Sequence, residues 1–203
     1  MNLPNKITLT RIFMIPIFVL VFFLDGVLPS IGGMPIAYAL AAIIFALAAF
    51  TDFIDGYIAR KYKLVTNLGK FLDPIADKVL VSTAMILLLT MGGLFRGWSW
   101  TKAGYISLAV CICVIMAREL IISAFRQIAA ARGLVLAAEK LGKYKTTFQD
   151  VSIVVLLVSG SVPNLAGDII CIVGLVLFAI ATILTIWSGI SYVAKNKHVL
   201  KDA

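Results

Sequence analysis

Residues 52–77, DFIDGYIARKYKLVTNLGKFLDPIAD, hold four of the ten acidic residues of this 203-residue chain. A helix turns by about 100° per residue, so the first part of this stretch would gather two carboxylates and two small residues on one face. Those residues are Asp52, Asp55, Gly56 and Ala59. Asp73 and Asp77 lie four residues apart and are neighbours on a helix surface. The sequence therefore predicts two helices that each direct two carboxylates into one space.

Four neighbouring carboxylates need compensating positive charge, because they repel one another and are costly to bury. Oxygen ligands suit hard cations such as Mg²⁺, Mn²⁺ or Ca²⁺. The sole histidine, His198, lies in the C-terminal tail, which argues against zinc or copper chemistry. Two cations could share four carboxylates and keep positions open for phosphate oxygens. The alternatives are acidic residues on a surface or a structural ion cluster.

The spacing Asp-x2-Asp-Gly-x2-Ala-Arg-x8-Gly-x3-Asp-x3-Asp resembles the signature of the CDP-alcohol phosphotransferases. Members of this family are membrane enzymes that displace CMP from a CDP-linked substrate with an alcohol. The resemblance implies two divalent cations, Mg²⁺ or Mn²⁺, on Asp52, Asp55, Asp73 and Asp77. It also implies that Asp77 is the general base. The residues that the resemblance assigns to a CDP site are Asp52, Gly56, Ala59, Arg60 and Gly69.

Near the N-terminus, Asn5, Thr8 and Arg11 recur every third residue. They could present an amide, a hydroxyl and a guanidinium along one side, which suits a phosphate or a nucleotide. Ordinary anchoring at the membrane interface is the alternative. Because the family often carries a similar Asn-x2-Thr-x2-Arg segment, we expect Thr8 at the CDP site and Arg11 at the phosphate of the acceptor.

The composition is that of an integral membrane protein, with 62% hydrophobic residues and a mean hydropathy of +1.05. Six windows are long enough to cross a hydrocarbon core about 30 Å thick. They cover residues 7–25, 35–59, 71–93, 103–127, 145–163 and 167–194. We expect one domain, residues 1–203, of the all-α class: a bundle of six transmembrane helices with a short N-terminal amphipathic segment. The last helix shows no motif and is a candidate dimer surface, so we expect a homodimer.

Lysine and arginine gather on the cytoplasmic side of membrane proteins. With this bundle, sixteen of the eighteen basic residues fall on one side, and only Arg96 and Lys102 fall on the other. Both termini and the acidic motif should then face the cytoplasm of a bacterial-type membrane. The net charge of +8 is spread over helix ends near lipid headgroups, so no nucleic-acid partner is expected. The three cysteines lie in apolar spans and should be reduced packing residues.

Basic residues after the acidic motif predict an anion site. Arg118 stands in an apolar stretch, where an arginine is costly unless it is functional or paired. Contact with Glu119 or snorkelling to the interface are the alternatives for it. Three lysines at residues 140–145 could neutralise a phosphate, although cytoplasmic helix ends commonly carry such clusters. The residues expected to bind the acceptor phosphate are Arg11, Arg118, Lys140, Lys143 and Lys145, with Arg126 in reserve.

Segments 117–126 and 142–149 resemble the phosphatidylglycerophosphate synthase branch of the family. This implies transfer of the phosphatidyl group from CDP-diacylglycerol, a membrane lipid, to sn-glycerol 3-phosphate, with release of CMP. Direct attack is favoured because no Ser, Cys or His accompanies the acidic motif. Inositol phosphate, serine and phosphatidylglycerol are alternative acceptors, and a cation or proton transporter is the alternative of another class.

Overall fold

A computed structural model describes residues 2–31, 34–62, 66–91, 94, 101–131, 134 and 140–197. This part of the chain is almost entirely helical, and each window expected to cross the membrane falls on one helix. The helices are α1 (Leu3–Phe23), α2 (Ile36–Lys61), α3 (Asn67–Thr90), α4 (Thr101–Ala131), α5 (Lys140–Ser161) and α6 (Asn164–Lys195). A short antiparallel pair, β1 (Ser30–Ile31) and β2 (Met34–Pro35), joins α1 to α2.

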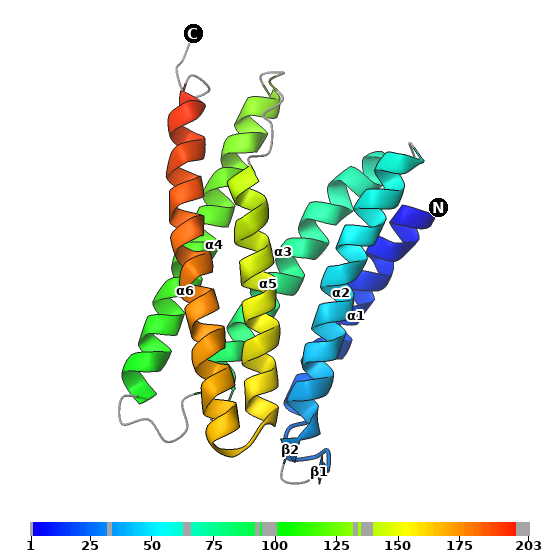
Figure 1. Ribbon diagram of the computed structural model, residues 1–203. Coiled ribbons are helices and arrows are strands. Elements are labelled where there is room, and N and C mark those ends of the chain that lie inside the picture. The colour runs from blue at the N-terminus through cyan, green and yellow to red at the C-terminus, as the bar shows by residue number, and fades with distance from the viewer. Residues whose placement is uncertain are drawn as a thin grey trace.

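The helices form two groups that separate at one end of the bundle (Figure 1). Helix α1 lies along α2, and α6 contacts both α4 and α5. Helix α5 also contacts α2, and α3 runs between the groups with contacts to α1, α2, α4 and α5. The N-terminal end of α1 and the C-terminal end of α6 lie at the end where the groups separate, opposite the β1–β2 pair (Figure 1). The fold therefore opens a space at the end that holds the N-terminal parts of α1, α3 and α5.

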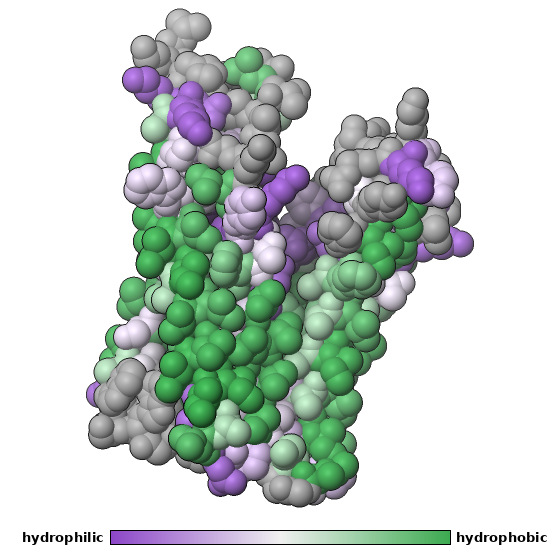
Figure 2. Space-filling model, in the orientation of Figure 1, coloured by the Kyte–Doolittle hydropathy of each residue, from purple (hydrophilic) through white to green (hydrophobic). Residues whose placement is uncertain are grey.

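Aromatic and aliphatic side chains from several helices fill the interior below that space. Phe18 of α1 contacts Phe45 of α2 with ring centroids 5.9 Å apart, and neither is exposed. Ile153 of α5 and Phe178 of α6 belong to the same buried cluster. Exposed apolar side chains surround this core, and Figure 2 shows them as a broad band on the visible face. A continuous apolar surface of this size is typical of a membrane interface.

Among the residues that the structure describes, four helices are long and apolar enough to cross a membrane. The candidate spans are Pro4–Phe23, Ile36–Gly56, Lys102–Ala130 and Asn164–Lys195. Helices α3 and α5 have 24 and 22 residues, but each carries several charged residues in its N-terminal half, and these lower its hydropathy. An all-α membrane protein is thus the fold observed, whereas six crossings and cytoplasmic termini remain predictions.

The expected N-terminal amphipathic segment forms the first turns of α1. The polar side chains of this segment form hydrogen bonds with residues of α2 and α3 and with Thr66, so the segment packs inside the bundle. Asn5, Thr8 and Arg11 are only 5%, 1% and 0% exposed. Their row points toward α2 and α3, so the polar end of α1 contributes to the candidate site.

Candidate active site

The N-terminal parts of α1 and α3 meet the C-terminal part of α2 in an ionic network, which we call the acidic half: Thr8, Arg11, Asp52, Asp55 and Asp73. Arg11 Nη1 lies 2.7 Å from Asp52 Oδ1, and its Nη2 lies 2.5 Å from Asp55 Oδ2. Its Nε also donates to Thr51 Oγ1 at 3.3 Å. The guanidinium therefore bridges the two carboxylates of α2, which are three residues apart as the sequence predicted.

The Thr8 hydroxyl joins the carboxylates of α2 and α3. Its Oγ1 lies 2.7 Å from Asp73 Oδ1 and 3.4 Å from Asp55 Oδ2. A hydroxyl has one proton, so it donates to one carboxylate at a time, and the shorter distance favours Asp73. Asp55 and Asp73, eighteen residues apart in the sequence, thus approach the same oxygen atom.

The groups of the acidic half that could bind a metal ion are three carboxylates and the Thr8 hydroxyl. All of them offer oxygen atoms, which suit hard divalent cations. The side chain of Asp52 is also 45% exposed, which leaves its carboxylate accessible. Within the described residues, however, no three acidic, His or Cys side chains converge closely enough to hold a metal ion. Arg11 and Thr8 lie between the carboxylates instead, so metal binding would require the carboxylates to turn toward one another.

Gly69 lies where the start of α3 meets α1. A Cβ atom at this position would lie 2.9 Å from Asn5 Oδ1 and 3.2 Å from Thr66 Oγ1. Thr66 caps α3, because its hydroxyl accepts a hydrogen bond from the Gly69 N–H at 3.0 Å and donates to Asn5 Oδ1 at 2.9 Å. The missing side chain therefore allows the close packing that brings Asp73 to Thr8.

Other residues expected at the CDP site lie on the last turns of α2. Gly56 directly follows Asp55 and is partly exposed. The backbone of Ala59 and Arg60 is helical, and their side chains lie outside the described part of the structure. The same is true of the Lys140 side chain at the start of α5.

A second region, the basic half, is a cavity of about 510 Å³ between α3, α4, α5 and α6. Figure 2 shows hydrophilic side chains gathered in the hollow between the two helix groups. The charged residues that line the cavity are Asp77, Lys78, Arg118, Glu119, Arg126, Lys143 and Lys145. The structure thus brings together Asp77 and three residues expected to bind the acceptor phosphate. Arg11, also expected there, instead contacts Asp52 and Asp55.

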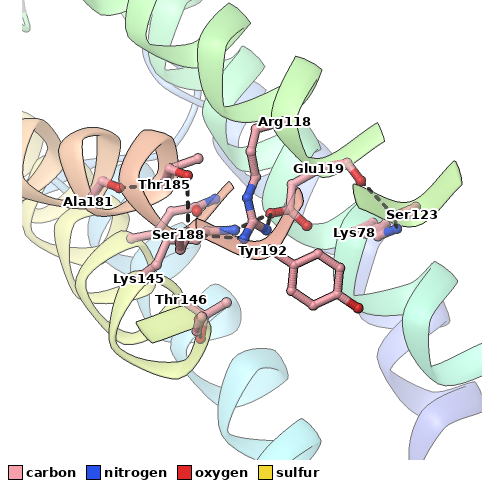
Figure 3. Close-up of polar contacts among 12 residues, drawn as sticks. Lys78, Arg118, Glu119, Ser123, Lys145, Thr146, Ala181, Thr185, Ser188 and Tyr192 are labelled. Carbon is pink, nitrogen blue, oxygen red and sulfur yellow. Dashed lines mark hydrogen bonds and ion pairs between the residues drawn. The ribbon is translucent and has the colours of Figure 1, made fainter. Parts of the chain in front are cut away.

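Glu119 lies between two of the cations of the basic half (Figure 3). Its Oε1 accepts a hydrogen bond from Arg118 Nη1 at 2.9 Å and a second one from Lys145 Nζ. The Lys145 side chain is 3% exposed and that of Arg118 is 16% exposed. Two partly or fully buried cations therefore share one carboxylate oxygen at the cavity wall.

Helix α6 supports the arginines of the basic half, although its sequence shows no motif. Ser188 Oγ accepts a hydrogen bond from Arg118 Nη2 at 3.0 Å. A Cβ atom on Gly189 would lie 3.0 Å from Arg118 Cγ, so this glycine lets the arginine lie against the helix. The Tyr192 hydroxyl lies 3.2 Å from Arg126 Nε, and the Arg126 guanidinium lies 5.3 Å from the centre of the Tyr192 ring. The only sign of this role in the sequence was the presence of small and polar residues, such as Ser188 and Gly189, on an otherwise apolar helix.

Residues 1–187 match the CDP-alcohol phosphatidyltransferase family. The chain belongs to this family. Within the family, it is similar to proteins named CDP-diacylglycerol–glycerol-3-phosphate 3-phosphatidyltransferase. The Bacillus subtilis (strain 168) protein is 39% identical over 100% of this chain and 98% of its own length. The Rickettsia bellii (strain RML369-C) protein is 38% identical over 94% of this chain and 93% of its own length. The Shigella flexneri serotype 5b (strain 8401) protein is 38% identical over 99% of this chain and 98% of its own length.

Membership in the CDP-alcohol phosphatidyltransferase family confirms the resemblance drawn from the acidic motif. The similarity also extends far beyond that motif, since the relatives align along nearly their whole lengths.

Proposed function

We propose that this protein transfers the phosphatidyl group of CDP-diacylglycerol to sn-glycerol 3-phosphate, which releases CMP and forms phosphatidylglycerophosphate. The observation that carries the proposal is the position of Asp77. It follows Asp73 of the acidic half by one turn of α3, and it lines the cavity of the basic half. A diphosphate at the acidic half and an acceptor in the cavity would meet at this carboxylate. The names of the full-length relatives support the same reaction.

In the reaction, a hydroxyl oxygen of glycerol phosphate bonds to the phosphorus that carries the diacylglycerol, and the bond from that phosphorus to CMP breaks. The carboxylate of Asp77 is positioned to take the hydroxyl proton. Asp52, Asp55, Asp73 and Asp77 are the residues that would hold two divalent cations. Such cations, when bound, offset the charge of the diphosphate and of the departing CMP. Thr8 and the small residues Gly56, Ala59 and Gly69, with Arg60, are proposed to shape the CDP site.

The basic half is proposed to bind the phosphate of the acceptor. Arg118, Lys143 and Lys145 line the same cavity as the proposed base, and Lys140 begins the helix that carries both lysines. Charged hydrogen bonds from arginine and lysine suit a phosphate dianion. We leave Arg11 out of this set, because all its described contacts are with Thr51, Asp52 and Asp55.

The site lies at the end of the bundle that holds the N-terminal end of α1, the C-terminal end of α6 and most of the described basic residues, which supports a cytoplasmic position at the inner face of a bacterial-type membrane (Figure 1). A lipid substrate could reach this position from the bilayer and a soluble anion from the cytoplasm. We also propose a homodimer in which α6 contributes to the contact between the two copies.

The test is release of CMP by the purified protein with CDP-diacylglycerol, Mg²⁺ or Mn²⁺ and a panel of acceptors. We expect glycerol 3-phosphate to support the fastest release. Faster release with inositol phosphate, serine or phosphatidylglycerol would keep the chemistry and replace the acceptor. Ion flux in liposomes without CMP release would contradict the enzyme proposal as a whole.

A further inference from the structure

We propose that Glu119 is an exchangeable internal anion of the basic half: without an acceptor, its carboxylate takes the place that the acceptor phosphate occupies between Arg118 and Lys145. This inference rests on the proposed function, since it concerns the acceptor site of the same reaction. It assigns Glu119 a role in acceptor specificity rather than in the chemical step.

The contacts at Glu119 are those that a phosphate oxygen would make. A single oxygen, Oε1, accepts hydrogen bonds from both Arg118 and Lys145 (Figure 3). Like charges in a poorly hydrated space repel strongly, so the two cations need an anion between them to stay close together. Glu119 supplies that anion and keeps both groups in place before the acceptor arrives.

Arg118 keeps an unused donor for an incoming anion. Its Nη1 binds Glu119 and its Nη2 binds Ser188, but its Nε is buried and has no hydrogen-bond partner among the described atoms. An unpaired buried N–H is costly, and a phosphate could take it up as part of a two-point contact with the guanidinium. The arginine is therefore only partly satisfied by the carboxylate.

The carboxylate of Glu119 has room to move. Its side chain is 29% exposed, whereas that of Lys145 is 3% exposed. Glu119 lines the large cavity and also a smaller one of about 110 Å³ between α3, α4 and α5. Lys78 lines both cavities, as does Asp77, and Asp150 lines the smaller one, so a displaced carboxylate would have Lys78 as a cation nearby but would also meet other acids.

This arrangement would select acceptors by charge. A phosphate dianion can replace the single negative charge of Glu119 and leave both cations compensated. An uncharged hydroxyl compound cannot, so it would have to bind beside an intact ion cluster. A site commonly rejects a wrong partner by leaving charges unpaired when that partner binds.

The experiment measures thermal unfolding of the purified full chain in detergent against rising inorganic phosphate and glycerol 3-phosphate. We expect both to stabilise the wild type, and Glu119→Gln to reach the half-maximal shift at a phosphate concentration lowered roughly 10-fold, as loss of a competing charged contact of about 1.4 kcal/mol predicts. Glu119→Asp, which keeps the charge but shortens the side chain, should lie between the two. Asp168→Asn on α6 makes the same change in net charge away from the cavity and should behave as the wild type.

An unchanged or raised half-maximal concentration in Glu119→Gln would overturn the inference, since Glu119 would then support phosphate binding rather than compete with it. If Glu119→Gln does not fold, the Glu119→Asp result decides by the same criterion. The wild type tests the proposed function separately. If neither anion stabilises it and Arg118→Ala has the same KM for glycerol phosphate, the basic half is not the acceptor site, and the inference falls with it.

Discussion

In each half of the site, one side chain bridges two groups of opposite charge, but the acidic half buries that side chain and the basic half leaves it at a cavity. Arg11 is completely buried and donates to Thr51, Asp52 and Asp55. Glu119 is 29% exposed and contacts two cations. The comparison indicates that Arg11 is a fixed part of the scaffold, whereas Glu119 can be exchanged for a ligand.

The difference fits what each half is proposed to bind. Arg11 holds Asp52 and Asp55 on one guanidinium, and the proposed cations would bind only after these carboxylates turn toward one another. The proposed acceptor would enter and leave in every turnover, and an internal anion that gives way would keep Arg118 and Lys145 compensated between turnovers. Asp77 connects the two halves, because it follows Asp73 of the acidic half by one turn of α3 and lines the cavity of the basic half.

Replacing Asp77 with Asn should cause the largest loss, because it removes the point where the halves meet. We expect kcat to fall by at least the ~10²- to 10⁴-fold typical of a lost general base, while the protein still folds. The measurement is CMP release at saturating concentrations of both substrates, together with the melting temperature. Turnover near that of the wild type would refute the role of Asp77, and Asp168→Asn should retain full turnover as the matched Asp-to-Asn control.

Replacing Arg11 with Met should mainly lower stability, because it leaves two close carboxylates without their cation. Removal of one partner from a buried ion pair costs ~3–5 kcal/mol. We expect a clearly lower melting temperature, and a larger rise on addition of Mn²⁺ than in the wild type, because the freed carboxylates can then be compensated by the metal ion. A melting temperature equal to that of the wild type would remove the distinction between a fixed and an exchangeable counter-ion.

Replacing Arg118 with Ala should act on one substrate only. Loss of charged hydrogen bonds worth about 1.5–3 kcal/mol predicts a KM for glycerol phosphate raised roughly 10- to 100-fold. The KM for CDP-diacylglycerol should change little, because the contacts of Arg118 all lie in the basic half. Lys102→Ala, which removes an exposed cation at the other end of α4, is the control. Equal changes in both KM values would contradict the assignment of Arg118 to the acceptor.

The acidic half could be predicted from the sequence because local spacing determines most of it. Asp52 and Asp55 lie on one face of α2 through helical periodicity alone, and Asp73 and Asp77 are one turn apart on α3 for the same reason. The six helices followed from apolar windows of sufficient length. The row of Asn5, Thr8 and Arg11 was also visible as a period of three.

The partners of those residues could not be predicted, because they depend on how the helices pack. The period of three did not show that Arg11 would meet Asp52, 41 residues later, rather than a bound phosphate. Contact between Arg118 and Ser188 spans 70 residues and joins a recognisable segment to a helix without a motif. Long-range contacts of this kind arise only when α6 is placed against α4.

Gly189 gives the smallest and most specific test, because it acts on the basic half through Arg118 alone. A methyl group there would press on Arg118 Cγ and weaken the hydrogen bond from its Nη2 to Ser188. Loss of about 0.5–1.5 kcal/mol predicts that Gly189→Ala raises the KM for glycerol phosphate roughly 2- to 10-fold, with kcat unchanged. Ser188→Ala should have the same effect, because it removes the acceptor of that hydrogen bond.

A second glycine of α6 provides the matched control for the Gly189 test. A Cβ atom on Gly174 would lie 2.8 Å from the side chain of Leu156, which belongs to the apolar core. Gly174 is fourteen residues before Ser188, the first α6 residue at the cavity. Overpacking of this kind costs ~1–3 kcal/mol, so Gly174→Ala should lower the melting temperature without changing the KM for glycerol phosphate. If both alanine variants change stability and neither changes that KM, α6 supports the bundle alone. A rise in KM confined to Gly189→Ala would show that α6 positions the acceptor site through Arg118.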